Sequence, residues 1–278
     1  MKSGFATLVG RPNVGKSTLL NAILGEKISI VAPSPQTTRM EIRGVLTRPD
    51  AQVVFVDTPG IHKPRTTMGE RLNATAAAAS SDVDVVCFVI DATAPLGKGD
   101  RFVAGRVPKD AICVVNKVDA ASKDEVLLQL TRAAALDLSE YFPVSARTGE
   151  GVDALVASIV ARLPEGPQYY PEEMTSDLPD EVWVAELVRE QLLAVVREEL
   201  PHSIACRVTE YEWPRIRVEI VVERDSQKGI VIGKGGAVLK QVGQAVRAQL
   251  REGAYIELVV KVDPDWQRQP KSLDRLGY

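Results

Sequence analysis

The chain has 278 residues, of which 45 % are hydrophobic, and its formal net charge is -3. Its length and composition allow a sizeable core in one large domain or two smaller ones, and the charge excludes a strongly basic molecule. No run approaches the roughly 20 apolar residues that span a bilayer, and we expect no signal peptide, because no long apolar stretch precedes Gly10. Three scattered cysteines lack metal-ligand spacing: Cys87, Cys113 and Cys206. We therefore expect a cytoplasmic protein in a reducing compartment.

Short runs rich in Val and Ile recur through the first part of the chain without polar alternation, which is typical of strands buried on both faces. These runs lie at residues 5–10, 52–60, 83–93, 111–119 and 141–146. Helical stretches lie between them at residues 16–24, 71–80, 123–136 and 152–163. The alternation predicts an α/β domain with a doubly wound, mostly parallel sheet. Ligands bind beyond the carboxyl ends of strands in such sheets.

The first run leads into GRPNVGKST, which fits the P-loop pattern and precedes a predicted helix. Its glycines let backbone N–H groups point at phosphate oxygens, and the helix adds its positive N-terminal end. We expect Lys16 to reach the β- and γ-phosphates and the Ser17 hydroxyl to bind Mg²⁺. A chance match in an ordinary loop is the alternative, which the flanking strand and helix disfavour. The expected nucleotide-binding residues are Gly10, Arg11, Pro12, Asn13, Val14, Gly15, Lys16, Ser17 and Thr18.

The second apolar run ends in Asp57-Thr58-Pro59-Gly60. An acid at that strand end can hold Mg²⁺ through a water, and the Gly60 N–H can approach a γ-phosphate because no side chain blocks it. Pro and Gly also form plain turns by themselves. The P-loop upstream favours a metal and phosphate site at these four residues.

Another strand end carries Asn116, Lys117 and Asp119 in the sequence NKVD. A guanine ring offers N1–H and an exocyclic amine as donors, which the Asp119 carboxylate can accept, whereas adenine lacks that pair. Asn116 and the Lys117 stem can hold the loop and cover the base. The next strand end adds the weaker signal Ser145-Ala146-Arg147, whose backbone N–H groups could meet the guanine oxygen. A solvated polar turn is the alternative, and a metabolic P-loop kinase or ATPase is disfavoured by NKVD.

These four motifs, in this order, resemble the translation-factor class of GTPases. The resemblance implies hydrolysis of GTP to GDP and phosphate with Mg²⁺. It places the first switch at Thr37-Thr38-Arg39 and implies a Mg²⁺-binding threonine, for which we favour Thr38 over Thr37. Both threonines could instead be ordinary loop hydroxyls. The residues assigned to catalysis are Lys16, Thr38, Gly60 and Asn13, and those assigned to the metal are Ser17, Thr38 and Asp57.

Ile61 follows the DTPG motif, where Ras-like proteins have a water-orienting glutamine. An apolar side chain cannot position water, so we expect slow hydrolysis unless something else assists. In several relatives a P-loop asparagine helps to bind a monovalent cation, and Asn13 occupies that position. The resemblance therefore adds K⁺ as a candidate cofactor. Alternatively, Asn13 merely tolerates an unusual turn conformation.

The composition changes at residues 165–180, which hold three prolines, five acids and no basic residue. Such a stretch cannot continue a helix or join a central strand. It predicts a linker over 166–180 between a first domain at 1–165 and a second at 181–278 with a C-terminal tail. In the second domain we expect a helix at 181–200, strands at 204–211 and 215–224, a helix at 236–250 and a last strand at 255–263.

Gly233-Lys234-Gly235-Gly236 lies between a short apolar segment and a helix. A GxxG turn with a basic residue can approach a single-stranded nucleic-acid backbone closely, with the bases along an apolar groove. Six basic residues and one acid lie between residues 224 and 251, as a phosphate-binding surface requires. A solvated helix face is the alternative. The expected RNA contacts are Ile232, Gly233, Lys234, Gly235, Gly236 and Lys240.

The second domain resembles an α+β type II KH domain, and its fusion to a P-loop GTPase resembles the Era family over essentially the whole chain. The motifs that carry the resemblance are GRPNVGKSTLLN, QTTR, DTPGIHKP, NKVD, SARTGEGVD, IGKGGAVLK and LDRLGY. The resemblance implies a GTP-switched protein that binds small-subunit ribosomal RNA near its 3′ end and assists assembly of the small ribosomal subunit. Some members associate loosely with membranes, and this sequence shows no anchor; we expect a monomer. The alternative is an RNA-binding module whose structural nucleotide site barely turns over.

Overall fold

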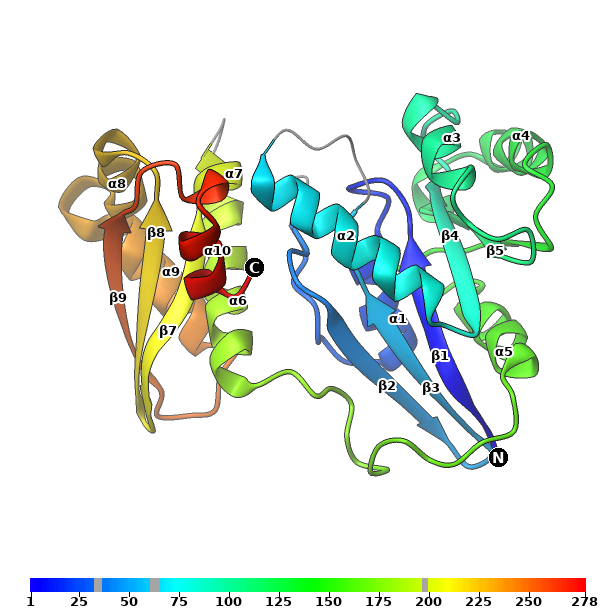
Figure 1. Ribbon diagram of the computed structural model, residues 1–278, viewed down its shortest axis with the longest axis horizontal. Coiled ribbons are helices and arrows are strands. Elements are labelled where there is room, and N and C mark those ends of the chain that lie inside the picture. Colours follow the sequence, from blue (N-terminus) through cyan, green and yellow to red (C-terminus); the bar gives the residue numbers. More distant parts are fainter. Residues whose placement is uncertain (33–36, 61–65, 197–199) are drawn as a thin grey trace. The chain divides into compact units, whose positions relative to one another are not determined.

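The computed structural model describes residues 1–32, 37–60, 66–196 and 200–278, which form two compact units (Figure 1). Unit 1 comprises Met1–Ser29, Thr38–Pro64 and Arg71–Asp177. Unit 2 comprises Ile30–Thr37, Arg65–Glu70 and Leu178–Tyr278.

Unit 1 is built on a six-stranded sheet with the order β2-β3-β1-β4-β5-β6. Only the edge pair β2–β3 is antiparallel, as expected for a mostly parallel sheet. The strands are β1 (Lys2–Val9), β2 (Ile42–Arg48), β3 (Ala51–Asp57), β4 (Val85–Asp91), β5 (Ile112–Asn116) and β6 (Glu140–Pro143). The helices along this part of the chain are α1 (Lys16–Leu24), α2 (Thr67–Ser81), α3 (Lys98–Ala104), the 3-10 turn η1 (Val118–Ala120), α4 (Lys123–Ala134) and α5 (Val152–Arg162).

The central strands are apolar throughout because helices cover both faces of the sheet. On β4, Cys87 packs into the cluster that includes residues of α1 and α5, and its neighbour Phe88 packs into the cluster that includes residues of α3 and α4. Both side chains are fully buried. Because successive side chains of a strand point to opposite faces, both core clusters require apolar residues from the same short run.

The strand register brings the polar strand ends of the sequence to one edge of the sheet. Leu8 of β1 pairs with Asp57 at the end of β3, and Asp91 at the end of β4 pairs with Asn116 at the end of β5. The P-loop follows β1 directly, so the phosphate, metal and base motifs lie at the same edge.

The acidic stretch after α5 runs along unit 1 as far as residue 177. Gln52 of β3 accepts hydrogen bonds from the backbone N–H groups of Tyr169 and Tyr170, at 2.7 and 3.0 Å. An isolated bridge joins Ser176 to Gly44 of β2. This part of the expected linker is therefore fixed to the sheet of unit 1 by the Gln52 side chain and by the bridge to β2.

Unit 2 combines helices with a three-stranded sheet of order β7-β8-β9, in which β7–β8 is antiparallel and β8–β9 parallel. Its strands are β7 (Ala205–Glu212), β8 (Arg215–Val222) and β9 (Tyr255–Val262). Its helices are α6 (Asp180–Val195), α7 (Leu200–Ser203), α8 (Asp225–Ile232), η2 (Lys234–Gly236), α9 (Ala237–Arg247), η3 (Trp266–Arg268) and α10 (Pro270–Leu276). Apolar side chains of α6, α8, α9 and all three strands form its core.

Over the described residues, none of the helices combines the length and the apolar character needed to cross a membrane.

Candidate functional site

The loop between β1 and α1 is shaped by residues with positive φ. Asn13 has a φ of 66° and Gly15 a φ of 93°. A Cβ on Gly15 would lie 2.4 Å from the Asn116 amide nitrogen, and one on Gly10 would lie 2.5 Å from the Val89 carbonyl oxygen. Both positions therefore require glycine. No side chain caps the N-terminus of α1, so its first N–H groups are available to an anion.

Lys16 is buried inside this loop. Its ammonium donates hydrogen bonds to the carbonyl oxygens of Gly10 and Arg11, at 3.1 and 3.0 Å. Burial lowers the pKa of Lys16 to about 8, although the nearby Asp57 carboxylate acts in the opposite direction. A phosphate in the loop would favour the charged form of this lysine.

Three hydroxyls converge on one oxygen of Asp57. The hydroxyls of Ser17, Ser29 and Thr38 lie 3.0, 2.9 and 3.4 Å from its Oδ2. Ser17 Oγ and Thr38 Oγ1 lie 2.9 Å apart. By contrast, Thr37 Oγ1 donates to the Ala32 carbonyl at 3.4 Å. Of the two adjacent threonines, Thr38 is thus the one whose hydroxyl meets Ser17 and Asp57.

The donor set around Asp57 fits Mg²⁺, which takes oxygen ligands and retains several waters. Asp57 Oδ1 is buried and has no hydrogen-bond partner among the described residues. Burial raises the pKa of the Asp57 carboxyl, while Lys16 and the three hydroxyls act to lower it. In the described part of the chain, no cluster of three or more His, Cys, Asp or Glu side chains could hold a metal by itself. A divalent ion here would therefore depend on hydroxyl and phosphate oxygens.

The DTPG segment closes against the P-loop. A Cβ on Gly60 would lie 3.0 Å from the backbone nitrogen of Pro12, so glycine permits this close approach. Thr58 Oγ1 is buried without a partner among the residues described, and Pro59 is buried beside it. Ile61, the residue expected in place of a water-orienting glutamine, lies outside the described residues.

The NKVD residues bind the P-loop directly. The Asn116 amide donates to the Val14 carbonyl at 2.9 Å, and the Lys117 ammonium donates to the Asn13 carbonyl at 2.7 Å. Lys117 also forms an ion pair with Asp91 at 2.6 Å. Burial acts to raise the pKa of Asp91, but hydrogen bonds from Lys117 and Thr93 lower it below its ordinary value.

Asp119 is held by the next strand end. Ser145 Oγ donates to Asp119 Oδ1 at 2.7 Å and accepts from the Thr148 N–H at 3.0 Å. The Ala146 N–H donates to Asn116 Oδ1 at 3.1 Å, and the Arg147 side chain is exposed. Ser145 thus orients the Asp119 carboxylate and leaves Oδ2 without a protein partner in the described structure.

Sequence reasoning missed Ser29, Asp91 and Asp100. Asp100 pairs with the Arg11 side chain through Nε at 2.6 Å, which holds that side chain toward α3. Asp91 is the last residue of an apolar strand run, and an acid at that position could have been predicted from the sequence as a site residue. Ser29 and Asp100 belong to no motif, and only the tertiary structure brings them to the site.

The GxxG turn of unit 2 joins α8 to α9. Gly233 has a φ of 73°, and a Cβ there would lie 2.9 Å from the Val238 nitrogen. A Cβ on Gly235 or Gly236 would have no other heavy atom within 4 Å, so the outer side of the turn is open. Lys234 and Lys240 are exposed, whereas Ile232 packs against the core. The backbone at Gly235 can therefore approach a ligand closely.

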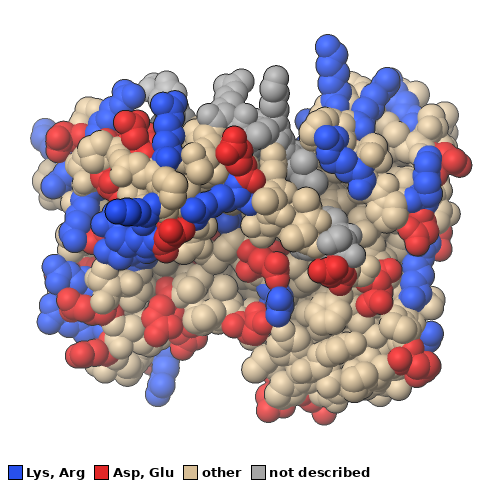
Figure 2. All heavy atoms as spheres, in the orientation of Figure 1, with Lys and Arg blue, Asp and Glu red and all other residues tan. Residues whose placement is uncertain are grey.

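Charge and apolar surface accompany this turn. Lys and Arg side chains gather over the side of unit 2 that carries α8 and β9 (Figure 2). Ile230 of α8, three residues before Gly233, is 57 % exposed. An exposed isoleucine beside a basic turn suits the apolar groove on which bases lie. Sequence reasoning did not single out Ile230.

These features define a GTPase joined to a KH domain: a P-loop, the Asp119 carboxylate of NKVD at a strand end of the same sheet, and a GxxG turn between two helices. The family model described as "50S ribosome-binding GTPase" matches residues 5–117, and the KH domain model matches residues 199–267. GTPase Era of Mycobacterium avium strain 104 is 46 % identical over 295 residues, covering 100 % of this chain and 99 % of its own. GTPase Era of Mycolicibacterium smegmatis is 45 % identical over the same length. The chain therefore belongs to the Era family of GTPases.

Two solved structures agree with this assignment. Era in complex with MgGDPNP and nucleotides 1506–1542 of 16S ribosomal RNA matches with a TM-score of 0.95 and 39 % identity, covering 100 % of this chain and 99 % of that one. A variant of Aquifex aeolicus Era bound to GDP and AlF4⁻ matches with a TM-score of 0.94, 38 % identity and the same coverage. These matches confirm the expected fold class and GTPase activity.

Replacing Lys16 with alanine should weaken GTP binding at least roughly 100-fold, because a charge-assisted contact to two phosphates is lost. Calorimetric titration with GTP measures the change. The matched control is Lys27→Ala, which removes an exposed lysine and should leave the affinity unchanged. Near-normal GTP affinity in the Lys16 variant would contradict the assigned role.

Proposed function

We propose that this GTPase uses its nucleotide cycle to gate RNA binding by its KH domain, and that the RNA is the 3′ end of small-subunit ribosomal RNA. The cycle would assist assembly of the small ribosomal subunit. One observation carries the proposal: a nucleotide site and a GxxG turn occur in one chain that matches, over its whole length, an Era solved with both MgGDPNP and 16S ribosomal RNA. We place the GTPase domain at 1–165, the linker at 166–180 and the KH domain at 181–278.

In this proposal the P-loop N–H groups and the N-terminus of α1 bind the phosphates of GTP. Lys16 contacts the β- and γ-phosphates, and the Gly60 N–H contacts the γ-phosphate. Mg²⁺, when bound, supplies positive charge that neutralises the phosphate oxygens. The Ser17 and Thr38 hydroxyls would hold it directly and Asp57 through a water. The Ser17 and Thr38 hydroxyls lie 3.0 and 3.4 Å from Asp57 Oδ2, and Oδ1 is buried without a partner in the described structure, so the carboxylate has acceptor capacity for such a water.

Thr38 is suited to report the γ-phosphate. It belongs to no helix or strand and lies four residues before the start of β2 at Ile42. Its hydroxyl lies 2.9 Å from Ser17 Oγ and 3.4 Å from Asp57 Oδ2, and both of these contacts are to residues of the expected metal site. Thr38 can therefore exchange these two contacts for a metal ligand position without disrupting the sheet, which makes it a candidate element of the switch.

We assign recognition of the guanine base to Asp119, supported by Asn116, Lys117 and the 145–147 strand end. Ser145 fixes one carboxylate oxygen of Asp119 at 2.7 Å. A carboxylate fixed in this way accepts from the two guanine donors and rejects adenine, which offers no such pair.

Replacing Asp119 with asparagine should shift preference from GTP toward xanthosine triphosphate. Asparagine offers a donor where guanine also offers donors, whereas xanthine presents a carbonyl oxygen. An unpaired polar group costs about 1–3 kcal/mol, so the preference should shift by roughly tenfold or more. Competition binding of both nucleotides measures it. The control Asp124→Asn changes an exposed acid at the start of α4; a preference that stays with GTP in the Asp119 variant refutes the assignment.

We further propose that K⁺ assists hydrolysis through Asn13. Asn13 is exposed on the P-loop and adopts a positive φ of 66°, and its carbonyl is held by Lys117. A fixed cation near the phosphates would stabilise the charge that develops during transfer.

Hydrolysis should therefore be at least roughly tenfold faster in K⁺ than in Na⁺ at equal ionic strength, because only a cation of fitting size occupies the position. Asn13→Ala should abolish the difference while retaining GTP binding. Single-turnover phosphate release measures the rates, and equal rates in both salts for the parent protein would reject the role of K⁺.

We propose a cytoplasmic monomer. Cys87, Cys113 and Cys206 are buried and form no disulfide, and burial raises the pKa of the Cys87 and Cys113 thiols to about 12. Cysteines outside disulfides suit a reducing compartment.

Replacing both Lys234 and Gly235 with aspartate should weaken binding of an oligonucleotide of the 16S 3′ end at least roughly tenfold, because charge is reversed and a side chain enters the close approach. Fluorescence anisotropy measures this, and parent binding should also fall with added salt. Lys271→Asp, at an exposed lysine of α10, is the charge-matched control. Unchanged RNA binding by a folded double variant would refute the KH assignment, and a parallel loss of GTP affinity would refute independence of the two sites.

A further inference from the structure

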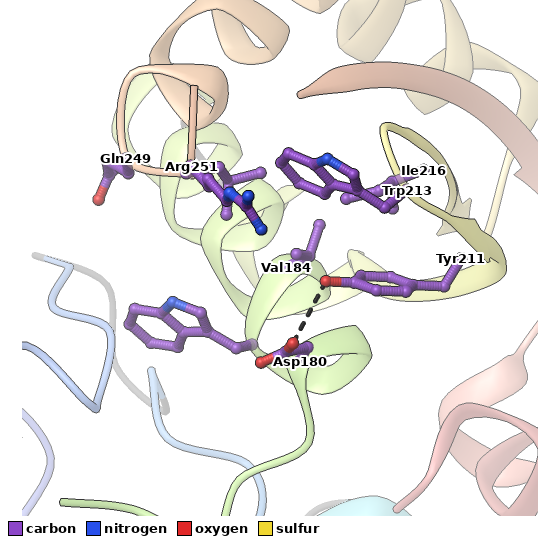
Figure 3. A pocket seen from close by; sticks show the side chains of 9 residues that line it. Asp180, Val184, Tyr211, Trp213, Ile216, Gln249 and Arg251 are labelled. Carbon is purple, nitrogen blue, oxygen red and sulfur yellow. Dashed lines mark hydrogen bonds between the residues drawn. The ribbon is translucent and has the colours of Figure 1, made fainter. Parts of the chain in front are cut away.

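A second concave site lies on unit 2, away from the GxxG turn (Figure 3). Its cavity has a volume of about 450 Å³. Its walls come from the start of α6, the β7–β8 hairpin and the segment after α9: Asp180, Trp183, Val184, Tyr211, Trp213, Ile216, Gln249, Leu250 and Arg251. The GxxG turn precedes the other end of α9, a helix of 11 residues that spans about 16 Å.

Aromatic rings form much of this pocket. Trp183, Tyr211 and Trp213 all line it, above a floor that includes the buried Val184 and Ile216. Trp213 remains 43 % exposed. An indole at the mouth of a pocket of this size offers a flat face to a planar ligand.

Arg251 places a guanidinium beside that face. Its central carbon lies 5.5 Å from the centre of the Trp213 ring. For comparison, the central guanidinium carbon of Arg106 lies only 3.5 Å from the centre of the Phe102 ring, so the Arg251–Trp213 pair is the more open of the two. No hydrogen bond or ion pair joins the Arg251 guanidinium to protein in the structure as described, and Figure 3 shows it directed into the cavity. Its donors are thus available to a ligand.

Asp180 places a carboxylate at the opposite side of the pocket. The Tyr211 hydroxyl donates to Asp180 Oδ2 at 3.4 Å, which orients the carboxylate. Burial raises the pKa of Tyr211, and Asp180 raises it further, so the phenol stays protonated and remains a donor. Asp180 retains acceptor capacity for a ligand.

We propose that this pocket binds a guanine base. Guanine stacks on an aromatic face, presents O6 and N7 as acceptors to an arginine, and presents N1–H and an exocyclic amine as donors to a carboxylate. The pocket contains each complement once, in Trp213, Arg251 and Asp180. Adenine lacks the O6 acceptor and the N1–H donor, and pyrimidines offer less stacking surface.

The base can come from an unpaired guanosine of an RNA strand or from a free guanine nucleotide, and both present the same edges. The inference that the base comes from RNA rests on the proposed RNA-binding function. The inference that the pocket recognises guanine is independent of that function. The pocket and the GxxG turn share no residue, so variants can separate them.

The test uses the full chain, preloaded with GDP and Mg²⁺ so that the P-loop site is filled. The trinucleotides UGU, UIU and UAU are titrated, where I is inosine, which lacks the exocyclic amine. Quenching of tryptophan fluorescence reports binding, since Trp183 and Trp213 line the pocket and Trp266 is buried in the fold. Guanosine monophosphate is titrated in parallel.

We expect UGU to bind at least tenfold more tightly than UAU, with UIU between them. Asp180→Asn and Arg251→Met should each abolish the preference, and Trp213→Ala should abolish most of the quench. The matched control Tyr255→Ala removes an aromatic ring that is 55 % exposed and lies outside the pocket, and should change nothing. A quench by guanosine monophosphate equal to that by UGU supports guanine recognition from the free pool, whereas a quench by UGU alone supports RNA as the source.

Equal affinity for the three trinucleotides overturns the proposal, as does an unchanged preference in the Asp180 and Arg251 variants. Equal quenching by a Glu-Phe-Glu peptide overturns it in favour of a protein partner. The Lys234 and Gly235 double variant should keep the UGU preference. Its failure to bind the longer ribosomal oligonucleotide therefore bears on the KH turn and not on this pocket.

Discussion

The nucleotide site depends on the joint burial of Lys16 and Asp57 at the carboxyl edge of the parallel sheet. Asp57 is fully buried, and its two oxygens differ: one faces three hydroxyls, and the other lacks a partner among the described residues. Burial opposes the charged form of both residues. Such a pair is costly unless further charges complete it. A phosphate beside Lys16 and a cation beside Asp57 would supply these charges. Ligand binding should therefore stabilise this edge of the sheet.

The NKVD residues, the P-loop and the 145–147 strand end form one hydrogen-bonded network. Asn116 and Lys117 donate to P-loop carbonyls, while Asn116 also accepts the Ala146 N–H. The residues that we assign to the base therefore also hold the phosphate loop in its positive-φ conformation. Removing the side chain of Asn116 or Lys117 would leave P-loop carbonyls unpaired. The loss would therefore affect phosphate binding as well as base recognition.

In unit 2, α9 separates two surfaces of different chemistry. Its N-terminus follows a basic turn whose glycines open the backbone to a ligand, and the segment after its C-terminus contributes to a pocket of aromatic rings with one arginine and one aspartate. Val242 and Val246 bury the helix in the core, which fixes the distance between the two surfaces. An RNA strand that occupied both surfaces would have to span this fixed distance.

The sequence by itself determined the P-loop, the polar strand ends and the central strands, because glycine spacing and apolar runs buried on both faces are local signals. It also determined α1 at residues 16–24. It did not predict β2, whose pairing with β3 stabilises a mixed run, or the start of α2 at Thr67, four residues before the expected one. It also described the segment of α8 only as an apolar stretch. Only the tertiary structure placed Ser29 on Asp57 and joined Asp180, Trp213 and Arg251 in one pocket, since these contacts join segments far apart in the chain and no local pattern encodes them.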